Sequence, residues 1–225
     1  MSQYNLSVIV PVYNEADQCD ALIRRLRLLQ DDVVKDVIVV DGGSQDNTVE
    51  RLSEEFTVIQ SEKGRANQMN AGAKHATGTW LLFLHADTDF SPSHAAAAIS
   101  DGALGKWGRF DVKLSGKRWS FVIISFFINW RSRLTGIATG DQCIFVRKKV
   151  FDDLGGFADI PLMEDVELSK RLKKIAKPVC IEKRVITSSR RWQQHGTLKT
   201  VLLMWKLRFF YWIGVKPERL AQMYR

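Results

Sequence analysis

The sequence predicts an α/β fold, in which an open and mainly parallel sheet carries helices on both faces. Short runs rich in β-branched residues, such as residues 6–13 and 36–41, alternate with helical stretches roughly ten to fifteen residues long, a pattern typical of βαβ units. The runs are apolar throughout, as expected for strands that are covered on both faces. With 225 residues, 45% of them hydrophobic, the chain can build one sizeable core.

The first hundred residues are expected to contain strands and helices in strict alternation. The strands are residues 6–13, 36–41, 57–61 and 79–85, and the helices begin near Glu15 and span residues 48–56 and 64–76. Apolar residues recur at helical spacing in the first helix, at Leu22, Ile23, Leu26 and Leu29. The second helix has two candidate capping residues, Asn47 and Asp46.

The alternation weakens after about residue 100. Strands are expected at residues 107–116 and 177–182, a strand running into a helix at 142–151, and helices at 117–134, 163–175 and 197–214. No internal repeat or low-complexity linker interrupts the chain. We therefore expect one domain over residues 1–194, followed by an amphipathic helical extension over residues 195–225.

The charge is unevenly distributed. Residues 1–100 carry a net charge of −6 and residues 101–225 carry +14, which together give the overall +8. A strongly basic second part suggests a surface that faces an anion. Anionic lipid, nucleic acid and a phosphorylated substrate all fit this composition, which does not choose among them.

The cysteines and the N-terminus indicate a reducing compartment. Cys19, Cys143 and Cys180 are widely spaced and form no CxxC pair, which argues against a disulfide framework or a thiolate zinc site. Residues 1–13 lack the basic and cleavable apolar regions of a secretory signal. We expect a cytoplasmic location, peripheral on the inner face of the cell membrane if the basic part binds lipid.

Two apolar helices are too short or too charged to span a bilayer. Residues 121–130 form an apolar run of ten residues, whereas a crossing needs about twenty. Residues 201–215 are interrupted by Lys206 and Arg208. Aromatic residues with interspersed cations fit a helix that lies on an anionic membrane surface, and they equally fit a helix packed on the core.

Polar residues follow three of the expected strands. Tyr13 and Glu15 follow the first strand, Asp41 and Asp46 the second, and the segment HADTD the fourth. Each group alone fits turn chemistry, but ligands of open α/β sheets bind at the carboxyl ends of strands. These residue types suit a nucleotide. An aromatic ring can stack on a base, and an aspartate can accept a hydrogen bond from a base or a ribose. Clustered acids can hold a divalent cation. No GxxxxGK[ST] or GxGxxG motif is present, so neither an ATPase nor a dinucleotide dehydrogenase is indicated.

Seven segments, in order, resemble the family 2 glycosyltransferases. They are VIVPVYNE, VIVVDGGSQDNT, GRANQMNAGA, LFLHADT, GDQCIFVRKKVFDDLGGF, MEDVELSKRL and SSRRW, and the resemblance covers roughly residues 5 to 192. It is greatest to a short bacterial subgroup of undefined substrate. The resemblance implies a GT-A fold, a nucleotide-diphospho-sugar donor that is usually UDP-linked, and inverting transfer to an acceptor hydroxyl.

The resemblance also implies roles for individual residues. The nucleotide pocket would be lined by Pro11, Tyr13, Glu15, Asp41, which contacts the base, and Arg65. Asp87 matches the last aspartate of the DxD metal motif. Asp165 matches the catalytic base, with Glu164 beside it. The residues that would contact the acceptor or the diphosphate are Asp141, Arg190, Arg191 and Trp192. The last three resemble the QxxRW segment.

Two positions depart from the family pattern. His85 stands where DxD has its first aspartate, and a second register, Asp87 to Asp89, follows directly. Since hard cations prefer oxygen ligands, a histidine in the site favours Mn²⁺ over Mg²⁺. His85, Asp87 and Asp89 are thus the candidate metal ligands. Ser188 replaces the glutamine of QxxRW, which makes the processive polymerases a poorer comparison.

We therefore expect a metal-dependent inverting glycosyltransferase that acts on a hydroxyl of a lipid-linked acceptor. A sugar-phosphate nucleotidyltransferase is an alternative, although it would use a Gly-rich N-terminal loop that the chain lacks. A basic nucleic-acid- or membrane-binding module without catalysis is another. The aromatic residues of the second part lie in apolar runs rather than on a basic stacking platform, so no nucleic-acid partner is expected.

Overall fold

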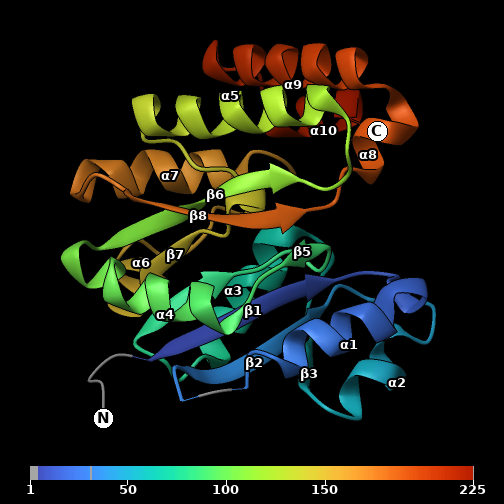
Figure 1. Cartoon of the computed structure of the whole chain (residues 1–225), viewed down its shortest axis with the longest axis vertical. Helices are drawn as coiled ribbons and strands as arrows, with labels where there is room; N and C mark the ends of the chain where they lie inside the picture. Colours follow the sequence, from blue (N-terminus) through green and yellow to red (C-terminus); the bar gives the residue numbers. More distant parts are fainter. Residues whose placement is uncertain (1–4, 31, 225) are drawn as a thin grey trace.

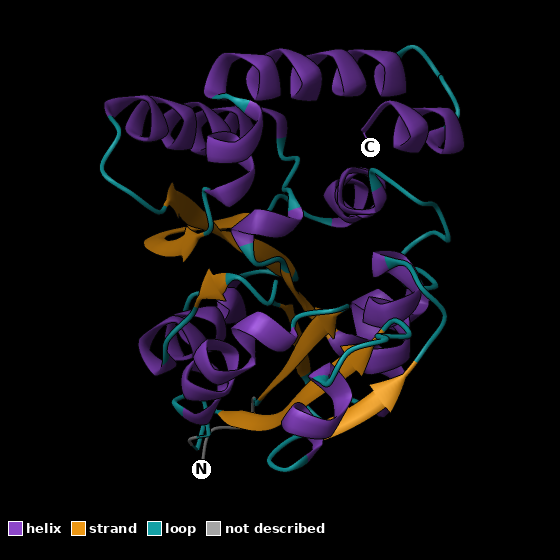
Figure 2. Ribbon diagram, turned by 90° about the vertical axis from the view of Figure 1, so that its right-hand side faces the viewer, coloured by secondary structure: helices purple, strands orange, loops and turns teal. Residues whose placement is uncertain are grey.

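A computed structural model describes residues 5–30 and 32–224, except for the side chains of Arg191 and His195. A central sheet is covered by helices on both faces, and a group of helices formed largely by the C-terminal segment lies at one end (Figures 1 and 2). The strand order is β3-β2-β1-β4-β7-β6-β8-β5. The predicted α/β architecture is confirmed.

The first half of the sheet is parallel. Its strands are β1 (Leu6–Val12), β2 (Val34–Asp41), β3 (Thr57–Gln60) and β4 (Trp80–Phe83). The helices that connect them are α1 (Cys19–Arg27), preceded by a short 3-10 helix (Ala16–Gln18), α2 (Thr48–Ser53) and α3 (Arg65–His75). All these elements were predicted, within a few residues at their ends. Asp46, not Asn47, accepts hydrogen bonds from the backbone and hydroxyl of Thr48 at the start of α2.

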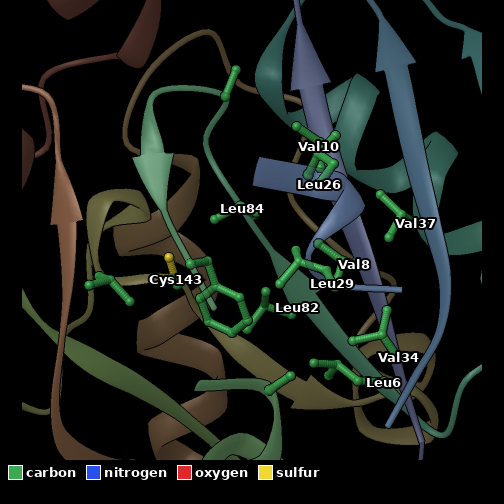
Figure 3. Packing of buried hydrophobic residues seen from close by; sticks show 14 of the residues in the cluster. Leu6, Val8, Val10, Leu26, Leu29, Val34, Val37, Leu82, Leu84 and Cys143 are labelled. Atoms are coloured by element: carbon green, nitrogen blue, oxygen red, sulfur yellow. The ribbon is translucent and has the colours of Figure 1, made fainter. Parts of the chain in front are cut away.

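Two hydrophobic clusters lie on the two faces of the sheet. Alternate residues of β1 point to opposite faces, because side chains along a strand alternate. Leu6, Val8 and Val10 pack with Leu26 and Leu29 of the α1 segment, as Figure 3 shows. Ile9 instead packs with α3 on the other face. The first cluster also includes α2 and α4 (Pro92–Ser100), and the second includes α6 (Lys148–Asp153) and α7 (Glu164–Ile175).

The second half of the sheet is mixed. It contains β5 (Thr88–Asp89), β6 (Trp107–Leu114), β7 (Phe145–Arg147) and β8 (Val179–Thr187). β7 runs antiparallel to both β4 and β6, β6 is parallel to β8, and β5 is antiparallel to β8. The short β5 and the helix α4 were not predicted. A two-residue strand carries no periodic signal. The start of α4 does carry a sequence signal, because Ser91 is a capping residue and Pro92 occupies the first helical position.

The apolar helix α5 (Trp119–Thr135) covers an edge of β6 rather than a face of the sheet. Asn129 accepts a hydrogen bond from the backbone of Val112 at 2.9 Å and donates one back at 3.0 Å. Ser125 accepts from Leu114 at 3.0 Å. These side chains satisfy backbone groups of β6 beyond its short pairing with β7. The opposite side of α5 is left exposed, including Phe126.

The C-terminal segment forms three helices, α8 (Arg190–His195), α9 (Thr197–Trp212) and α10 (Pro217–Tyr224). The helix predicted over residues 197–214 is confirmed as α9, whereas α8 and α10 were not predicted. The chain turns at Gly214, whose φ of +89° suits glycine, and α10 begins at a proline. Leu207 and Leu220 are buried together against Met163 and Val166, so α9 and α10 pack beside the start of α7. Across residues 5–30 and 32–224, no helix is long and apolar enough to cross a membrane.

Candidate functional site

A small cavity lies where the direction of the chain path reverses in the sheet. β2 and β3 lie on one side of β1, and β4 lies on the other, which is the arrangement that opens a crevice beyond the strand ends. The cavity has a volume of about 280 Å³. It brings together the predicted residues that follow β1 and β4 and the first residue of α3. They are Pro11, Tyr13, Glu15, His85, Asp87 and Arg65.

The loop after β1 is held in place by the loop after β2. The backbone N–H of Asn14 donates to Ser44 Oγ at 2.8 Å, and Asn14 Oδ1 accepts from the backbone of Gln45 at 2.9 Å. The backbone N–H of Glu15 donates to Thr48 Oγ1 at 2.8 Å. These reciprocal bonds explain why Asn14 tolerates a φ of +51°, a conformation that asparagine adopts more readily than most residues. The cavity rim is therefore built jointly by both loops.

Asp41 holds this rim in place through hydrogen bonds to residues 43 and 44. Its side chain is fully buried and does not line the cavity. Its carboxylate accepts from the backbone of Gly43 at 2.9 Å, from the backbone of Ser44 at 3.0 Å and from Ser44 Oγ at 2.5 Å. Direct contact between Asp41 and a base stays a prediction, whereas its role in holding residues 43–44 follows from these bonds.

Two residues that the sequence analysis did not single out support the cavity: Gln68 lines it, and Lys63 contacts the lining residue Tyr13. Gln68 Nε2 donates to the carbonyl oxygens of Val12 and Val40, both at 2.8 Å, and so ties the ends of β1 and β2 together. Lys63 Nζ lies 3.8 Å from the centre of the Tyr13 ring, a cation–π contact. Both residues lie in or next to the segment GRANQMNAGA, which was the available signal.

The polar groups of the small cavity have perturbed acidities. Burial raises the pKa of Asp87, against the opposing charges of Arg190 and Arg65. Burial also raises the pKa of Glu15, and the positive charge of Arg190 opposes this rise. Burial and the charge of Arg65 lower the pKa of His85 to about 3, so its imidazole is neutral at physiological pH. A neutral imidazole and a carboxylate thus face the same cavity.

The three candidate metal ligands do not converge. Asp89 belongs to β5, its side chain is 59% exposed, and it pairs with Arg25 at 3.1 Å outside the cavity. In the part of the chain that the structure describes, no three His, Cys, Asp or Glu side chains cluster as a metal site. Asp87 and His85 remain as a pair of oxygen and nitrogen donors that could hold a divalent cation. Such a pair fits a cation whose remaining ligands come from a bound diphosphate and water.

A larger cavity of about 740 Å³ adjoins the small one. Arg65 and His85 line both cavities and form their common boundary. Asp141, Glu164 and Asp165 add acidic groups to the larger one. Much of its remaining lining comes from apolar side chains of α5 and α9. The predicted catalytic acids are therefore next to the predicted nucleotide pocket, although they are far away in the sequence.

The two acids at the start of α7 have different environments. Asp165 Oδ2 accepts from the backbone of Gly140 at 2.8 Å and its Oδ1 accepts from the backbone of Val166 at 2.7 Å. Burial raises the pKa of Asp165, and both hydrogen bonds oppose this rise. Burial and the neighbouring charge of Asp165 raise the pKa of Glu164 to about 7, while Arg65 opposes it. Asp165 is thus held rigidly, and Glu164 titrates near neutral pH.

Gly140 is required by a close approach. A Cβ atom at this position would lie 2.5 Å from Nε2 of His85, closer than real side-chain contacts. The absence of a side chain lets the short helix Gly140–Gln142 approach both His85 and Asp165. Asp141 on this helix has a buried Oδ1 that finds no hydrogen-bond partner in the part of the chain that the structure describes. An acceptor group is consequently left unused inside the larger cavity.

The segment that resembles QxxRW contributes to the two cavities in different ways. Arg190 is exposed, its Nε donates to Ser188 Oγ at 3.2 Å, and its charge acts on Asp87 and Glu15. Trp192 lines the larger cavity. The side chain of Arg191 lies outside the described part of the chain.

Backbone strain is concentrated in these segments. Among the described residues, the non-glycine residues with positive φ are Asn14, Cys143 and Met163. Asn14 follows β1, Cys143 ends the Gly140–Gln142 helix, and Met163 directly precedes Glu164. Such conformations cost on the order of 1–3 kcal/mol and persist only where the surroundings enforce them. The clustering supports this region as the functional site.

Comparison with known sequences identifies related proteins. The family model described as Glycosyl transferase family 2 matches residues 7–155. An uncharacterized glycosyltransferase of Mycobacterium tuberculosis is 30% identical over 189 residues, covering 78% of this chain and 71% of the relative. An uncharacterized glycosyltransferase of Haemophilus influenzae is 41% identical over 91 residues, covering 39% of this chain and 31% of the relative.

A third relative carries a more specific name. The undecaprenyl-phosphate 4-deoxy-4-formamido-L-arabinose transferase of an Enterobacter strain is 31% identical over 108 residues, covering 43% of this chain and 33% of the relative. This chain therefore spans about a third of the length of the Haemophilus and Enterobacter proteins.

Solved structures share the fold. The mannosyltransferase PcManGT from Pyrobaculum calidifontis, in complex with GDP-Man and Mn²⁺, has a TM-score of 0.67 at 18% identity and covers 99% of this chain and 69% of that one. TarS of S. aureus, in complex with UDP, has a TM-score of 0.65 at 20% identity and covers 82% of this chain and 60% of that one. The likeness confirms the expected GT-A fold.

Proposed function

The chain belongs to glycosyl transferase family 2 and is a glycosyltransferase. From that premise we propose that it moves a sugar from a nucleotide-diphospho-sugar, with UDP as the favoured nucleotide, to a hydroxyl of an amphiphilic or lipid-linked acceptor. A divalent cation, Mn²⁺ rather than Mg²⁺, assists the reaction. The enzyme works at the inner face of the cell membrane.

The observation that carries this proposal is the shared wall of the two cavities. Arg65 and His85 line both of them, so a donor in the small cavity presents its sugar toward the larger one. Tyr13, with its ring beneath Lys63, offers a stacking surface for the base. The acids at the start of α7 lie on the far side of that shared wall from the nucleotide, where an attacking hydroxyl would be.

The residues divide the chemistry between them. Arg65 and Arg190 place positive charge beside the diphosphate as it departs. Asp87 and His85 would hold the cation, which supplies further electrostatic stabilisation of that leaving group. The acceptor oxygen attacks the anomeric carbon from the face opposite the diphosphate, and the configuration inverts.

Asp165 is the proposed general base, which removes the proton of the acceptor hydroxyl. Both of its oxygens are oriented by backbone N–H groups, and each retains a lone pair for the proton. Its position at the start of α7 places it at the positive end of a helix. Glu164, with its pKa raised to about 7, is partly protonated at physiological pH and is therefore the weaker candidate.

An amphiphilic acceptor accounts for the exposed apolar side chains of α5 and α9. Trp119 and Phe126 of α5 are 76% and 60% exposed, and Leu202 and Trp212 of α9 are 57% and 76% exposed. Figure 1 shows the two helices side by side at one end of the molecule, and Ile124 packs with Val201 between them. The basic second part adds attraction to acidic headgroups. One relative is named for action on undecaprenyl phosphate, which agrees with this class of acceptor.

The test is a screen of nucleotide sugars for thermal stabilisation, with Mn²⁺ or Mg²⁺ present. A ligand of the native state raises the apparent melting temperature, so the true donor should raise it and its sugar should then appear on an added acceptor. UDP-sugars are expected to give the largest shifts. Formation of pyrophosphate from a sugar phosphate and a nucleoside triphosphate would instead identify a nucleotidyltransferase. No shift with any nucleotide sugar would refute the proposal.

A further inference from the structure

The larger cavity has apolar walls that come from two helices. Ile123, Phe127 and Trp130 line it from α5, and Met204 and Trp205 line it from α9. Several of these side chains are also more than 40% exposed, including Phe127 at 54% and Trp205 at 65%. The cavity therefore opens on the same apolar surface that the two helices present outside. An aliphatic chain could enter it without crossing a polar rim.

A partly buried cation lies beside this apolar wall. Arg131, on α5, lines the cavity, and its Nε and Nη2 atoms are both buried without a hydrogen-bond partner among the described residues. Burial and the charge of Arg208 lower the pKa of Arg131 to about 10. Unsatisfied buried N–H groups of a cation are costly, so native proteins rarely leave them unpaired. Nε and Nη2 form the edge of the guanidinium that binds a carboxylate or phosphate through two parallel hydrogen bonds.

Among the described residues, the nearby acids share no hydrogen bond with this group. Asp165 accepts backbone N–H groups of Gly140 and Val166, and its charge acts favourably on Arg131. Asp141 also acts on Arg131 through its charge, and its own buried Oδ1 lacks a hydrogen-bond partner within the described part of the chain. Arg208 of α9 adds a second cation to the same cavity. The cavity thus contains unused donors on one side and an unused acceptor on another.

We propose that Arg131 and Arg208 form a binding subsite for an anionic headgroup, phosphate or carboxylate, of an amphiphile whose apolar chain lies between α5 and α9. Phosphate oxygens would accept from Nε and Nη2 of Arg131. The unused Oδ1 of Asp141 would accept from a hydroxyl of the same ligand. That this ligand is the sugar acceptor rests on the proposed function, whereas its binding does not.

Charge complementarity and the apolar walls together favour an anionic amphiphile as the ligand of this cavity. A free phosphate ion would satisfy the arginines but leave the wall of Phe127, Trp130 and Trp205 in contact with water. A neutral amphiphile would cover the wall but leave the guanidinium unpaired. A ligand with both features satisfies the guanidinium of Arg131 and covers the apolar wall.

The test is isothermal titration with decyl phosphate below its micelle concentration. Decyl glucoside provides a neutral ligand with the same chain, and inorganic phosphate provides the anion without a chain. Decyl phosphate should bind the parent most tightly of the three. Arg131→Gln should raise its Kd about 10- to 100-fold, because hydrogen bonds to charged groups are the stronger kind. Arg208→Gln should raise it by a smaller factor.

Lys206→Gln is the matched control, since Lys206 is an exposed cation on α9 that does not line the cavity. It should bind decyl phosphate as the parent does. Without ligand, Arg131→Gln should melt close to the parent, because the substitution removes two unsatisfied buried N–H groups as well as the charge that attracts Asp141 and Asp165. A purely structural arginine would give a lower melting temperature. Should Arg131→Gln fail to fold, which the proposal does not predict, Arg208→Gln carries the comparison.

Three results would overturn the proposal. They are equal Kd values for decyl phosphate and decyl glucoside, an unchanged Kd in both arginine variants, and equally tight binding of inorganic phosphate alone. The last would assign the arginines to free phosphate. Titration of UDP with Mn²⁺ separates this proposal from the proposed function. Binding of decyl phosphate through Arg131 by a protein that binds no nucleotide sugar would leave the subsite standing and refute glycosyl transfer.

Discussion

The backbone N–H of Gly140 donates a 2.8 Å hydrogen bond to Oδ2 of Asp165. This bond joins the short helix that carries Asp141 to the first turn of α7. The proposed base and the unpartnered acid of the larger cavity are thereby held in a fixed relation. Any change at Asp165 will affect both.

Asp165→Asn should abolish transfer while donor binding is retained. Loss of a general base lowers the rate about 10²- to 10⁴-fold. The amide can keep only one of the two backbone hydrogen bonds, which should cost about 1 kcal/mol of stability. Single-turnover rates and UDP titration measure the two effects separately. Transfer close to that of the parent would assign the base to Glu164 or Asp141.

Asp87→Asn should remove metal-dependent turnover, and Asp89→Asn should change it little. Asp87 lines the small cavity, whereas Asp89 pairs with Arg25 on the surface, a contact that contributes within about 1 kcal/mol. Turnover of each variant is measured against Mn²⁺ and Mg²⁺ concentration. Manganese should support the higher parent rate if His85 is a ligand. A high rate in purified Asp87→Asn would contradict the metal assignment.

Asp41→Ala and Arg65→Ala should each weaken UDP binding about tenfold or more, by different routes. The first removes the carboxylate that holds Gly43 and Ser44, and the second removes a cation beside the diphosphate. Calorimetric titration measures Kd, and circular dichroism checks folding. Arg27→Ala is the control, because Arg27 pairs with Glu55 away from both cavities. Equal Kd values in all proteins would place the nucleotide elsewhere.

Glu164→Gln should stabilise the protein at pH 8 more than at pH 5. The folded-state pKa of Glu164 is about 7, above its ordinary 4.5, so the native state binds this proton more tightly than the unfolded state. Stability from this group is therefore present below pH 4.5 and is lost as the pH rises through 7. An amide does not titrate, and the difference between the two pH values should be about 1–3 kcal/mol. Equal melting-temperature differences at both pH values would contradict the shift.

Anionic vesicles should sediment the protein at low salt and less of it at high salt. Phe126→Ser combined with Leu202→Ser should reduce the bound fraction severalfold, because both side chains are exposed on the proposed membrane surface and neither lines the larger cavity. Leu104→Ser is the control, since Leu104 is 91% exposed but lies in the 3-10 helix Gly102–Leu104, outside α5 and α9. Equal recovery in the supernatant with and without vesicles would refute membrane docking and leave glycosyl transfer untouched.

The sequence by itself determined the parallel half of the sheet and the family. Alternation of apolar and helical runs is a local property, so β1 to β4 and their helices could be predicted from it. The seven segments predicted the family, which comparison confirmed. Short elements such as β5 escaped prediction, because two residues form a strand only when β8 pairs with them.

Only the tertiary structure decided which polar residues share a site. Asp87 lies in the turn after β4 and lines the small cavity, whereas Asp89 lies in β5 and pairs with Arg25 outside the cavity. Arg131 follows an apolar run that predicts a helix. That its Nε and Nη2 atoms lack partners among the described residues, in a cavity between α5 and α9, is evident only from the packing of these two helices. The burial of a side chain and its interaction partners depend on residues that are distant in the chain. A sequence pattern reports only on residues that are close in the chain.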